Sequence, residues 1–344
     1  MESEKPVGGA WNFDEENRLP PPKEPYSWPK YPNWQRDQID LEVIKEIDNS
    51  SYVGQIDEEI WGTTRQFALS QLDRFLDKSF ADFGSYEDAM TTKSWALHHS
   101  LLSPYLNLGL ITAEEVIDAA LKRYQKGKIP LSSCEGFIRQ IIGWREYING
   151  IYWLFGENYR NENHFGSNRK LLPLFEDASK TSMNCVANSI NDIEQRAWVH
   201  HIPRLMVLSN LAMLADINPA EFLAWMRRVF IDAADWVMVP NVIGMSMHAD
   251  GGKMSTKPYI AGGAYISRMS NYCSSCKYNP KLRVGENACP FTTLYWHYLN
   301  RNRELLKRNH RMFQQINASK KLADIEATIA AGDEILDGLE RGEV

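Results

Sequence analysis

The sequence lacks the segments that would take a protein out of the cytoplasm. Its first residues, MESEKPVGGAWNFDEEN, contain no basic stretch followed by an apolar run, which is the pattern of a secretion signal. No run approaches the roughly 18 apolar residues that a membrane helix needs. Cysteine is scarce, five in 344 residues, and an odd number does not indicate a disulfide framework. We therefore expect a cytoplasmic protein that does not contact a membrane.

Alternating runs of β-branched residues, which indicate strands, are missing as well. Apolar residues instead recur at intervals of three and four, the period of an amphipathic helix. The segments with this period are residues 66–80, 112–127, 134–156, 192–215 and 218–237. Thr112, before two glutamates, and Asn218, before Pro219, are typical helix N-caps. The predicted fold class is mostly α.

Proline and irregular composition divide the chain. Six prolines between residues 20 and 32 exclude helix there, and we expect an extended, linker-like segment over residues 1–50, with helical signals beginning near Ile39. Residues 51–315 are predicted to form a helical domain and residues 316–344 an acidic helical tail. A long irregular stretch is expected over residues 240–290, and a stretch of that length needs something to anchor it.

The charge is distributed unevenly. The whole chain carries a formal net charge of −6, yet residues 253–311 contain eleven Lys or Arg and only two acids, Glu286 and Glu304. A basic region on an otherwise acidic body favours binding of a polyanion in one orientation. The alternative is an ordinary solvated face.

Four cysteines supply the ligand set of a metal centre. Cys273 and Cys276 are separated by two serines, Cys289 precedes a proline, and Cys185 lies far upstream. Four thiolates suit either a zinc ion or a cubane iron-sulfur cluster, and the spacing alone leaves both open. Cys134 precedes an amphipathic helix and is interpreted as a packed free thiol.

Several long strings carry a family resemblance. CEGFIRQIIGWREYINGIYW, AWVHHIPRLMVLSN, HSLLSPYLNLG and the stretch from DAADWVMVPNVIG to NYCSSCKYNP resemble the iron-sulfur bacterial cryptochromes and photolyases. The likeness runs from about Lys5 to Arg311. It implies a helical FAD-binding domain of the photolyase and cryptochrome type, with a 4Fe-4S cluster on Cys185, Cys273, Cys276 and Cys289.

Full-length members begin with an α/β antenna domain, whereas this chain opens within what would be the interdomain linker. We therefore expect no antenna domain here. A separately encoded antenna domain is a candidate partner.

The resemblance also implies the flavin contacts. The phosphate-cradling turn corresponds to Ser100, Leu101, Leu102 and Ser103, and the arginines near the diphosphate correspond to Arg139 and Arg145. The contacts around the isoalloxazine ring correspond to Arg204, Asp232, Asp235 and Asn241. An Arg–carboxylate pair near the ring would tune flavin protonation and potential. Read without the resemblance, Ser103 is an ordinary helix cap and Asp235 is a solvated carboxylate.

Light-driven repair of ultraviolet-damaged DNA is the implied activity, with the 6-4 photoproduct as the favoured lesion. His201 corresponds to the histidine that donates a proton in family 6-4 photolyases, a role that suits the pKa of imidazole. His200 is its neighbour, and because the two point about 100° apart on a helix, only one is expected to reach the lesion. The alternative for either histidine is a ring packed in a helical core.

Four aromatic residues complete the implied site. Tyr259 and Tyr265 correspond to positions near the lesion pocket, and Trp144, otherwise a core residue, to an aromatic wall against the lesion. Trp225 corresponds to a member of the route that carries electrons to photo-oxidised flavin. The following residue is Met226, a poor carrier, so this route is expected to be altered.

Two other functions remain open at this point. One is a cryptochrome-type blue-light photoreceptor with little repair activity. The other is a cluster-bearing DNA-binding module without flavin, resembling the large subunit of primase. Retention of His201, Tyr259, Tyr265 and the basic region favours repair.

Overall fold

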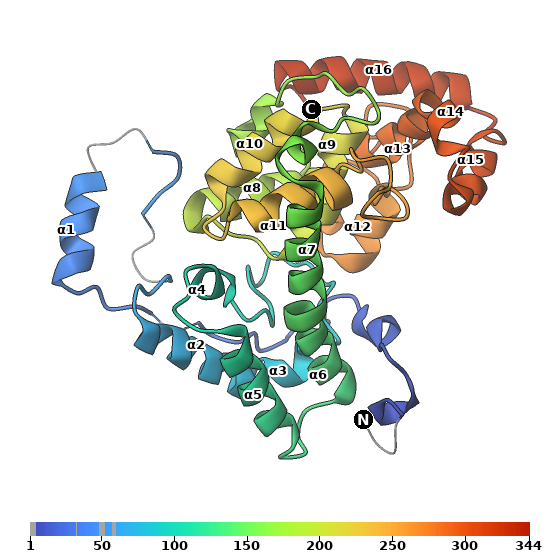
Figure 1. Cartoon of the computed structure of the whole chain (residues 1–344). Helices are drawn as coiled ribbons and strands as arrows, with labels where there is room; N and C mark the ends of the chain where they lie inside the picture. Colours follow the sequence, from blue (N-terminus) through green and yellow to red (C-terminus); the bar gives the residue numbers. More distant parts are fainter. Residues whose placement is uncertain (1–4, 32, 48–51, 57–59) are drawn as a thin grey trace. The chain divides into compact units, whose positions relative to one another are not determined.

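The computed structural model describes all residues except 1–4, 32, 48–51 and 57–59. Over the described residues the chain folds into helices joined by loops, without a sheet (Figure 1). Isolated bridges pair Arg169 with Ile217 and Asn279 with Ala288. The mostly α prediction is confirmed. None of the described helices is long and apolar enough to cross a membrane.

The chain divides into two compact units. Unit 1 comprises residues 1–147 and 194–200, and unit 2 comprises residues 148–193 and 201–344. The helices of unit 1 are η1 (Val7–Gly9), η2 (Asp14–Asn17), α1 (Gln38–Ile47), α2 (Arg65–Lys78), α3 (Phe80–Phe83), α4 (Ser103–Asn107), α5 (Ala113–Tyr124), α6 (Leu131–Ile138) and η3 (Arg139–Trp144). This division does not follow the predicted boundaries, and the boundary placed at residue 50 lies outside the described residues.

Unit 2 begins within α7 (Arg145–Phe155). Its other helices are η4 (Glu157–Asn161), η5 (Pro173–Phe175), η6 (Ala178–Lys180), α8 (Asn184–Arg196, whose last three residues belong to unit 1), η7 (Pro203–Ser209), α9 (Asn210–Leu214), α10 (Pro219–Val229), α11 (Asp235–Pro240), η8 (Asn241–Ser246), α12 (Gly263–Met269), η9 (Tyr272–Ser275), α13 (Pro290–Arg301), α14 (Arg303–Leu306), η10 (His310–Met312), α15 (Phe313–Ser319) and α16 (Ile325–Arg341).

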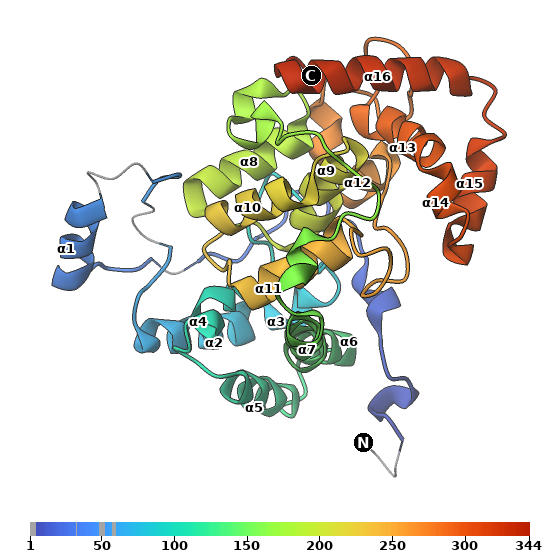
Figure 2. The same cartoon turned by 45° about the horizontal axis from the view of Figure 1, so that its top comes forward.

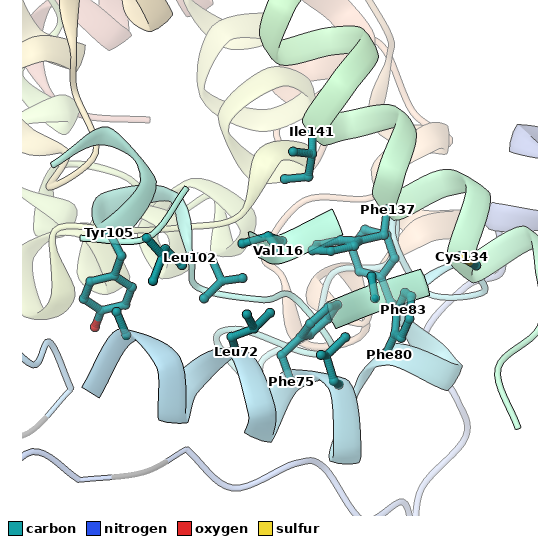
Figure 3. Packing of buried hydrophobic residues seen from close by; sticks show 14 of the residues in the cluster. Leu72, Phe75, Phe80, Phe83, Leu102, Tyr105, Val116, Cys134, Phe137 and Ile141 are labelled. Atoms are coloured by element: carbon teal, nitrogen blue, oxygen red, sulfur yellow. The ribbon is translucent and has the colours of Figure 1, made fainter. Parts of the chain in front are cut away.

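Aromatic rings fill the core of unit 1 (Figure 3). Phe137 of α6 contacts Phe75, Phe80 and Phe83, with ring centroids 4.7–5.6 Å apart. The neighbouring α5 begins with a capping box in which Thr112 and Glu115 bond each other's backbone N–H groups. The predicted cap at Thr112 is therefore confirmed, and the apolar stripe behind it packs Val116 and Ala120 into this core.

The predicted tail belongs to the core of unit 2. Its main helix, α16, lies along α13 (Figures 1 and 2). His297 of α13 hydrogen-bonds the Asp333 carboxylate at 3.0 Å, and Gly332 leaves room for the imidazole. Arg283 donates to Asp324 at 2.9 Å. Both His297 and Arg283 flank Cys289, so the tail braces the segment that carries this cysteine.

Three sequence-based expectations are corrected. The helix predicted over residues 192–215 is interrupted after α8, because Ala197 adopts a left-handed φ of 51°. The helix predicted over 218–237 ends with α10 and resumes with α11. The irregular stretch over 240–290 contains η8 and α12. Apolar periodicity does not reveal such breaks, because they depend on single backbone angles.

Candidate functional site

The four cysteines predicted to hold a metal centre come together in unit 2. Cys185 lies on α8, Cys273 in η9, Cys276 directly after it, and Cys289 caps the N-terminus of α13. All four line one small cavity, together with Met183, Gly263, Ile266, Tyr272, Tyr278 and Phe291. Residues of α8, of η9 and of the N-terminus of α13 therefore bring their thiols to a common space.

Gly263 makes room for this site. A Cβ at Gly263 would lie 2.7 Å from Cys289 Sγ and 2.9 Å from Thr292 Oγ1, closer than real Cβ contacts. Its backbone N–H donates to Thr292 Oγ1 at 3.1 Å, which in turn donates to the Pro280 carbonyl at 2.8 Å. The first turn of α12 is thereby held directly against the thiol of Cys289.

The chemistry of the thiols favours a positively charged occupant. Burial, reinforced by the neighbouring thiols, raises the pKa of Cys185 well above its usual value. Burial raises the pKa of Cys289 to about 11. Thiolates buried in an apolar cavity are stabilised when they bind metal, so the donor set fits a thiolate-bound centre. Within the described residues, no three Cys, His, Asp or Glu side chains are arranged to hold one metal ion.

Three π-helical segments coincide with predicted flavin or lesion contacts. These are η3, with Arg139 and Trp144, η7, with Arg204, and η8, which begins at Asn241. The π-helix is rare in proteins and is found frequently at functional sites, because the wider turn redirects side chains. The sequence did not predict these segments, since their apolar spacing is close to that of an α-helix.

The predicted phosphate-binding turn has unusual backbone geometry. Leu101 adopts a left-handed φ of 59°, and Leu102 follows with φ −93° and ψ −11°. Successive residues of opposite hand can turn their N–H groups to one side and form an anion-binding concavity. Gln71 Nε2 donates to the Ser100 carbonyl at 2.7 Å and holds the turn, and Ser103 begins α4.

Arg139 and Arg145 flank η3 in different surroundings. Arg139 Nε donates to Glu135 at 2.8 Å, and its guanidinium lies 3.6 Å from Asp14. Arg145 donates to Glu146 at 2.9 Å. The half-buried Trp144 contacts Tyr147, with centroids 5.7 Å apart. Each of these two arginines therefore has at least one carboxylate of the protein beside it.

Arg204 and Asp232 form the predicted Arg–carboxylate pair. The guanidinium donates two hydrogen bonds, of 2.8 and 3.1 Å, to the two carboxylate oxygens. The side chains are 15% and 8% exposed, and Phe230 covers the guanidinium with its ring centroid 4.0 Å away. Asp235 instead pairs with Arg227 at 2.7 Å and lies 3.7 Å from Arg160. Asn241 Nδ2 donates to the Val237 carbonyl at 2.8 Å.

The two adjacent histidines have different surroundings, although His200 lies just before the helical turn that contains His201 and the two do not share one helix as expected. His200 is buried and stacks on His99, with centroids 4.3 Å apart and planes 22° apart. His201 keeps an exposed surface in unit 2. Desolvation, and then the Arg204 cation, lower the pKa of His201 to about 4.

Asn210 is a site residue that the sequence analysis missed. This fully buried side chain accepts from the Ala261 N–H at 3.1 Å and donates to the Ala261 carbonyl at 2.8 Å. Ala261 lies between Tyr259, which is 37% exposed, and Tyr265, over whose ring Arg268 lies at 5.6 Å. Asn210 therefore fixes the segment between Tyr259 and the start of α12, the helix that carries Tyr265. Its position in an apolar helix, SNLAML, was the available signal.

Trp225 is buried within an aromatic group of unit 2. Its Nε1 donates to the Phe175 carbonyl at 3.0 Å, and its ring stacks on Phe222 at 5.6 Å. Phe230 is the next ring, 6.2 Å away, and Phe230 also covers Arg204. A continuous set of rings thus links Trp225 to the Arg204–Asp232 pair.

The basic region keeps much of its charge at the surface. Four of its members pair with acids, in the pairs Lys253–Glu162, Arg283–Asp324, Arg301–Asp216 and Lys307–Glu304. Exposed cations of the same region are Lys257, Arg268, Lys277, Lys281, Arg308 and Arg311. This composition suits a polyanionic partner.

Comparison with known proteins shows which proteins this chain resembles in sequence. The family model described as deoxyribodipyrimidine photo-lyase-related protein matches residues 1–61. A (6-4) photolyase of Agrobacterium fabrum (strain C58 / ATCC 33970) is 48% identical over 316 residues, which cover 91% of this chain and 62% of that protein. The chain thus spans about three fifths of that relative's length. Uncharacterized protein R853 of Acanthamoeba polyphaga mimivirus is 38% identical over 91 residues, 26% of this chain and 69% of that protein.

Two solved structures show weaker likeness. A bacterial class III photolyase from Agrobacterium tumefaciens aligns with a TM-score of 0.49 and 18% identity, over 83% of this chain and 57% of that one. A cryptochrome of Synechocystis sp. PCC6803 aligns with a TM-score of 0.45 and 17% identity, over 61% and 46%.

The chain is therefore similar in sequence to a photolyase over most of its length. Its first 61 residues match the family model of deoxyribodipyrimidine photo-lyase-related proteins.

Proposed function

We propose that this chain carries out light-driven repair of ultraviolet-damaged DNA, with the 6-4 photoproduct as its substrate. The observation that carries the proposal is the 48% identity to a (6-4) photolyase over 91% of the chain. The exposed cations of the basic region support DNA as the partner. A separately encoded antenna domain remains a proposed partner that would add light capture.

FAD is the proposed photoactive cofactor, and when bound it supplies an electron to the lesion on excitation and recovers it afterwards. The Ser100–Ser103 turn would hold its phosphates, with Arg139 and Arg145 as the nearby cations. Arg204 and Asp232 would set the charge beside the ring, because their mutual hydrogen bonds leave little freedom to move. Asn241 and Asp235 are the remaining proposed contacts. The π-helical geometry of three of these segments supports their role.

A 4Fe-4S cluster is the proposed occupant of the thiol cavity. In a cubane each cysteine binds a different iron atom, and four thiols around a shared space fit that requirement. In this proposal the cluster does not act on the flavin directly. It would hold α8, η9 and α13 together. Iron and sulfide analysis of anaerobically purified protein, against zinc content, tests this assignment.

His201 is the proposed proton donor to the 6-4 lesion. Its lowered pKa keeps the imidazole neutral at pH 7 in the chain without DNA. The negative charge of bound DNA phosphates would raise that pKa, so that His201 would be protonated when the DNA is bound. Tyr259 and Tyr265 would position the flipped bases, and Trp144 would stack on them. His200, buried against His99, would keep its neighbour's backbone in place.

The deciding experiment incubates reduced, illuminated protein with oligonucleotides that carry either a 6-4 photoproduct or a cyclobutane dimer, and separates products by chromatography. Restoration of the 6-4 lesion is expected, and His201→Ala is expected to abolish it while flavin absorbance remains. Restoration of neither lesion by flavin-bound protein would favour a blue-light photoreceptor. Protein that binds DNA but no flavin would be a cluster-bearing binding module. Photoreduction of Trp225→Phe tests the proposed electron route.

A further inference from the structure

Two cavities of unit 2 meet at one pair of cysteines. The inner cavity is lined by all four thiols. A second, open and polar pocket lies outside it and shares Cys273, Cys276 and Tyr278 with it. Serines, asparagines and lysines make up most of the rest of its lining: Ser267, Ser270, Asn271, Ser274, Lys277, Asn279, Pro280 and Lys281. Water and small polar solutes can therefore reach these two thiols.

The four thiols differ in access. Cys273 and Cys276 are half-buried, whereas Cys185 and Cys289 are only 7% and 8% exposed. Neither buried thiol lines the outer pocket. The metal centre proposed above would thus have two shielded ligands and two ligands at the solvent side.

The accessible pair also has the local geometry for a covalent link. Cys273 and Cys276 are three residues apart on the turn of η9, and the Cys276 N–H donates to the Cys273 carbonyl at 3.4 Å. Such a turn brings the two Cα atoms within the roughly 4.4–6.8 Å that disulfides span. Cys185 lies instead on α8 and Cys289 at the N-cap of α13. The helices fix the backbones of these two cysteines.

We propose that Cys273 and Cys276 form an oxidant-sensitive site, at which hydrogen peroxide converts the two metal-binding thiols into a disulfide and so releases the metal centre. One thiol takes an oxygen from the peroxide and becomes a sulfenic acid, while the O–O bond breaks and water leaves. The second thiol then displaces that oxygen as a second water, and the S–S bond forms. Each cysteine that leaves the metal centre as a thiolate takes one proton from water, and two thiols and one peroxide then give one disulfide and two waters.

The site is placed to affect the lesion-binding side of unit 2. Gly263 and Ile266 of α12 line the thiol cavity, and Tyr265 lies on the same helix between them. Loss of the occupant would leave the Cys289 thiol, which lies close to Gly263 of α12, without the metal bond that fixes it. Oxidation of the pair is therefore expected to loosen α12 and, with it, the proposed lesion contact.

The experiment treats the full chain, purified without oxygen, with increasing hydrogen peroxide, then alkylates free thiols and identifies disulfides by peptide mass spectrometry. Released iron is followed with a coloured chelator. The expected result is a Cys273–Cys276 disulfide that appears together with iron release and is reversed by dithiothreitol. Cys185, Cys289 and the buried Cys134 are expected to stay reduced at that stage.

A matched pair of variants tests the route of entry. Lys281→Trp fills the outer pocket without altering a thiol, and oxidation is expected to slow several-fold. Lys320→Trp places the same side chain at an exposed tail position and is expected to oxidise like the unaltered protein.

First oxidation at Cys185 or Cys289, or iron release with all thiols still reduced, would overturn the proposal. The inference rests on the proposed metal centre but not on light-driven repair. If the purified protein contains no iron, the assignment of a 4Fe-4S cluster is wrong. The thiol analysis would still show whether Cys273 and Cys276 oxidise first.

Discussion

Asn210 and Ala261 exchange two hydrogen bonds, of 3.1 and 2.8 Å, across a gap of 51 residues in sequence. One buried amide thereby satisfies both backbone groups of a residue between two proposed lesion contacts. Asn210 is therefore a positioning residue, because it acts on the lesion only through the turn that it holds in place.

Asn210→Leu should weaken lesion binding more than flavin binding. Leucine has a similar volume but leaves the Ala261 N–H and carbonyl unsatisfied, at a cost of roughly 1–3 kcal/mol. We expect a higher KM for damaged oligonucleotide and an unchanged flavin spectrum. The control is Asn300→Leu on α13, a side chain that bonds only Arg303. Equal loss of flavin and of lesion binding would contradict the positioning role.

Gly263→Ala should remove the metal centre, because the added Cβ would lie 2.7 Å from Cys289 Sγ. Gly262→Ala is the matched control, since its Cβ would meet nothing closer than 3.6 Å. Iron per protein and visible absorbance are the measurements. We expect little iron in the first variant and a normal content in the second. A normal iron content in Gly263→Ala would show that the thiols bind no cluster at this place.

Breaking the Arg204–Asp232 pair should destabilise the fold. Arg204→Gln leaves a carboxylate only 8% exposed without its partner's charge, which costs on the order of 3 kcal/mol. Adding Asp232→Asn removes that charge and should recover part of the loss, measured by urea unfolding in a double-mutant cycle. Arg341→Gln, from an exposed pair with Glu343, should change little. Strict additivity of the two changes would mean that the pair contributes no coupling.

Glu87→Gln should stabilise unit 1 at high pH. Burial first, and then Asp88, raise the pKa of Glu87 to about 7, whereas the unfolded chain keeps about 4.5. The folded state therefore binds a proton on Glu87 more tightly than the unfolded chain does. This proton binding stabilises the fold fully below pH 4.5, and the stabilisation is lost as the pH rises through 7. Gln140 can still bond the amide.

We expect the Glu87→Gln variant to unfold at higher urea than the parent at pH 8, by roughly 1–3 kcal/mol, and to match it near pH 4.5. The exposed Glu114→Gln on α5 should show no such divergence between the two pH values. Parallel curves for parent and Glu87→Gln across this range would contradict the raised pKa.

Local patterns explain why much of the fold was predictable. Periodic apolar residues and the caps at Thr112 and Asn218 depend on neighbours within four positions, and the helices α2, α5 and α10 follow them. The break at Ala197 and the π-helical turns were not predicted. They depend on backbone angles that the packing of distant segments selects, and local periodicity does not encode them.

The sequence by itself determined the helical class, the uneven charge and which four thiols are candidates for binding a metal centre, because residue type and spacing carry that information. Only the tertiary structure decided that these thiols share one cavity, that two of them face an open pocket, and that Arg204 donates hydrogen bonds to both carboxylate oxygens of Asp232. Contacts of this kind join residues tens of positions apart, so they arise only once the chain has folded and excluded water between them.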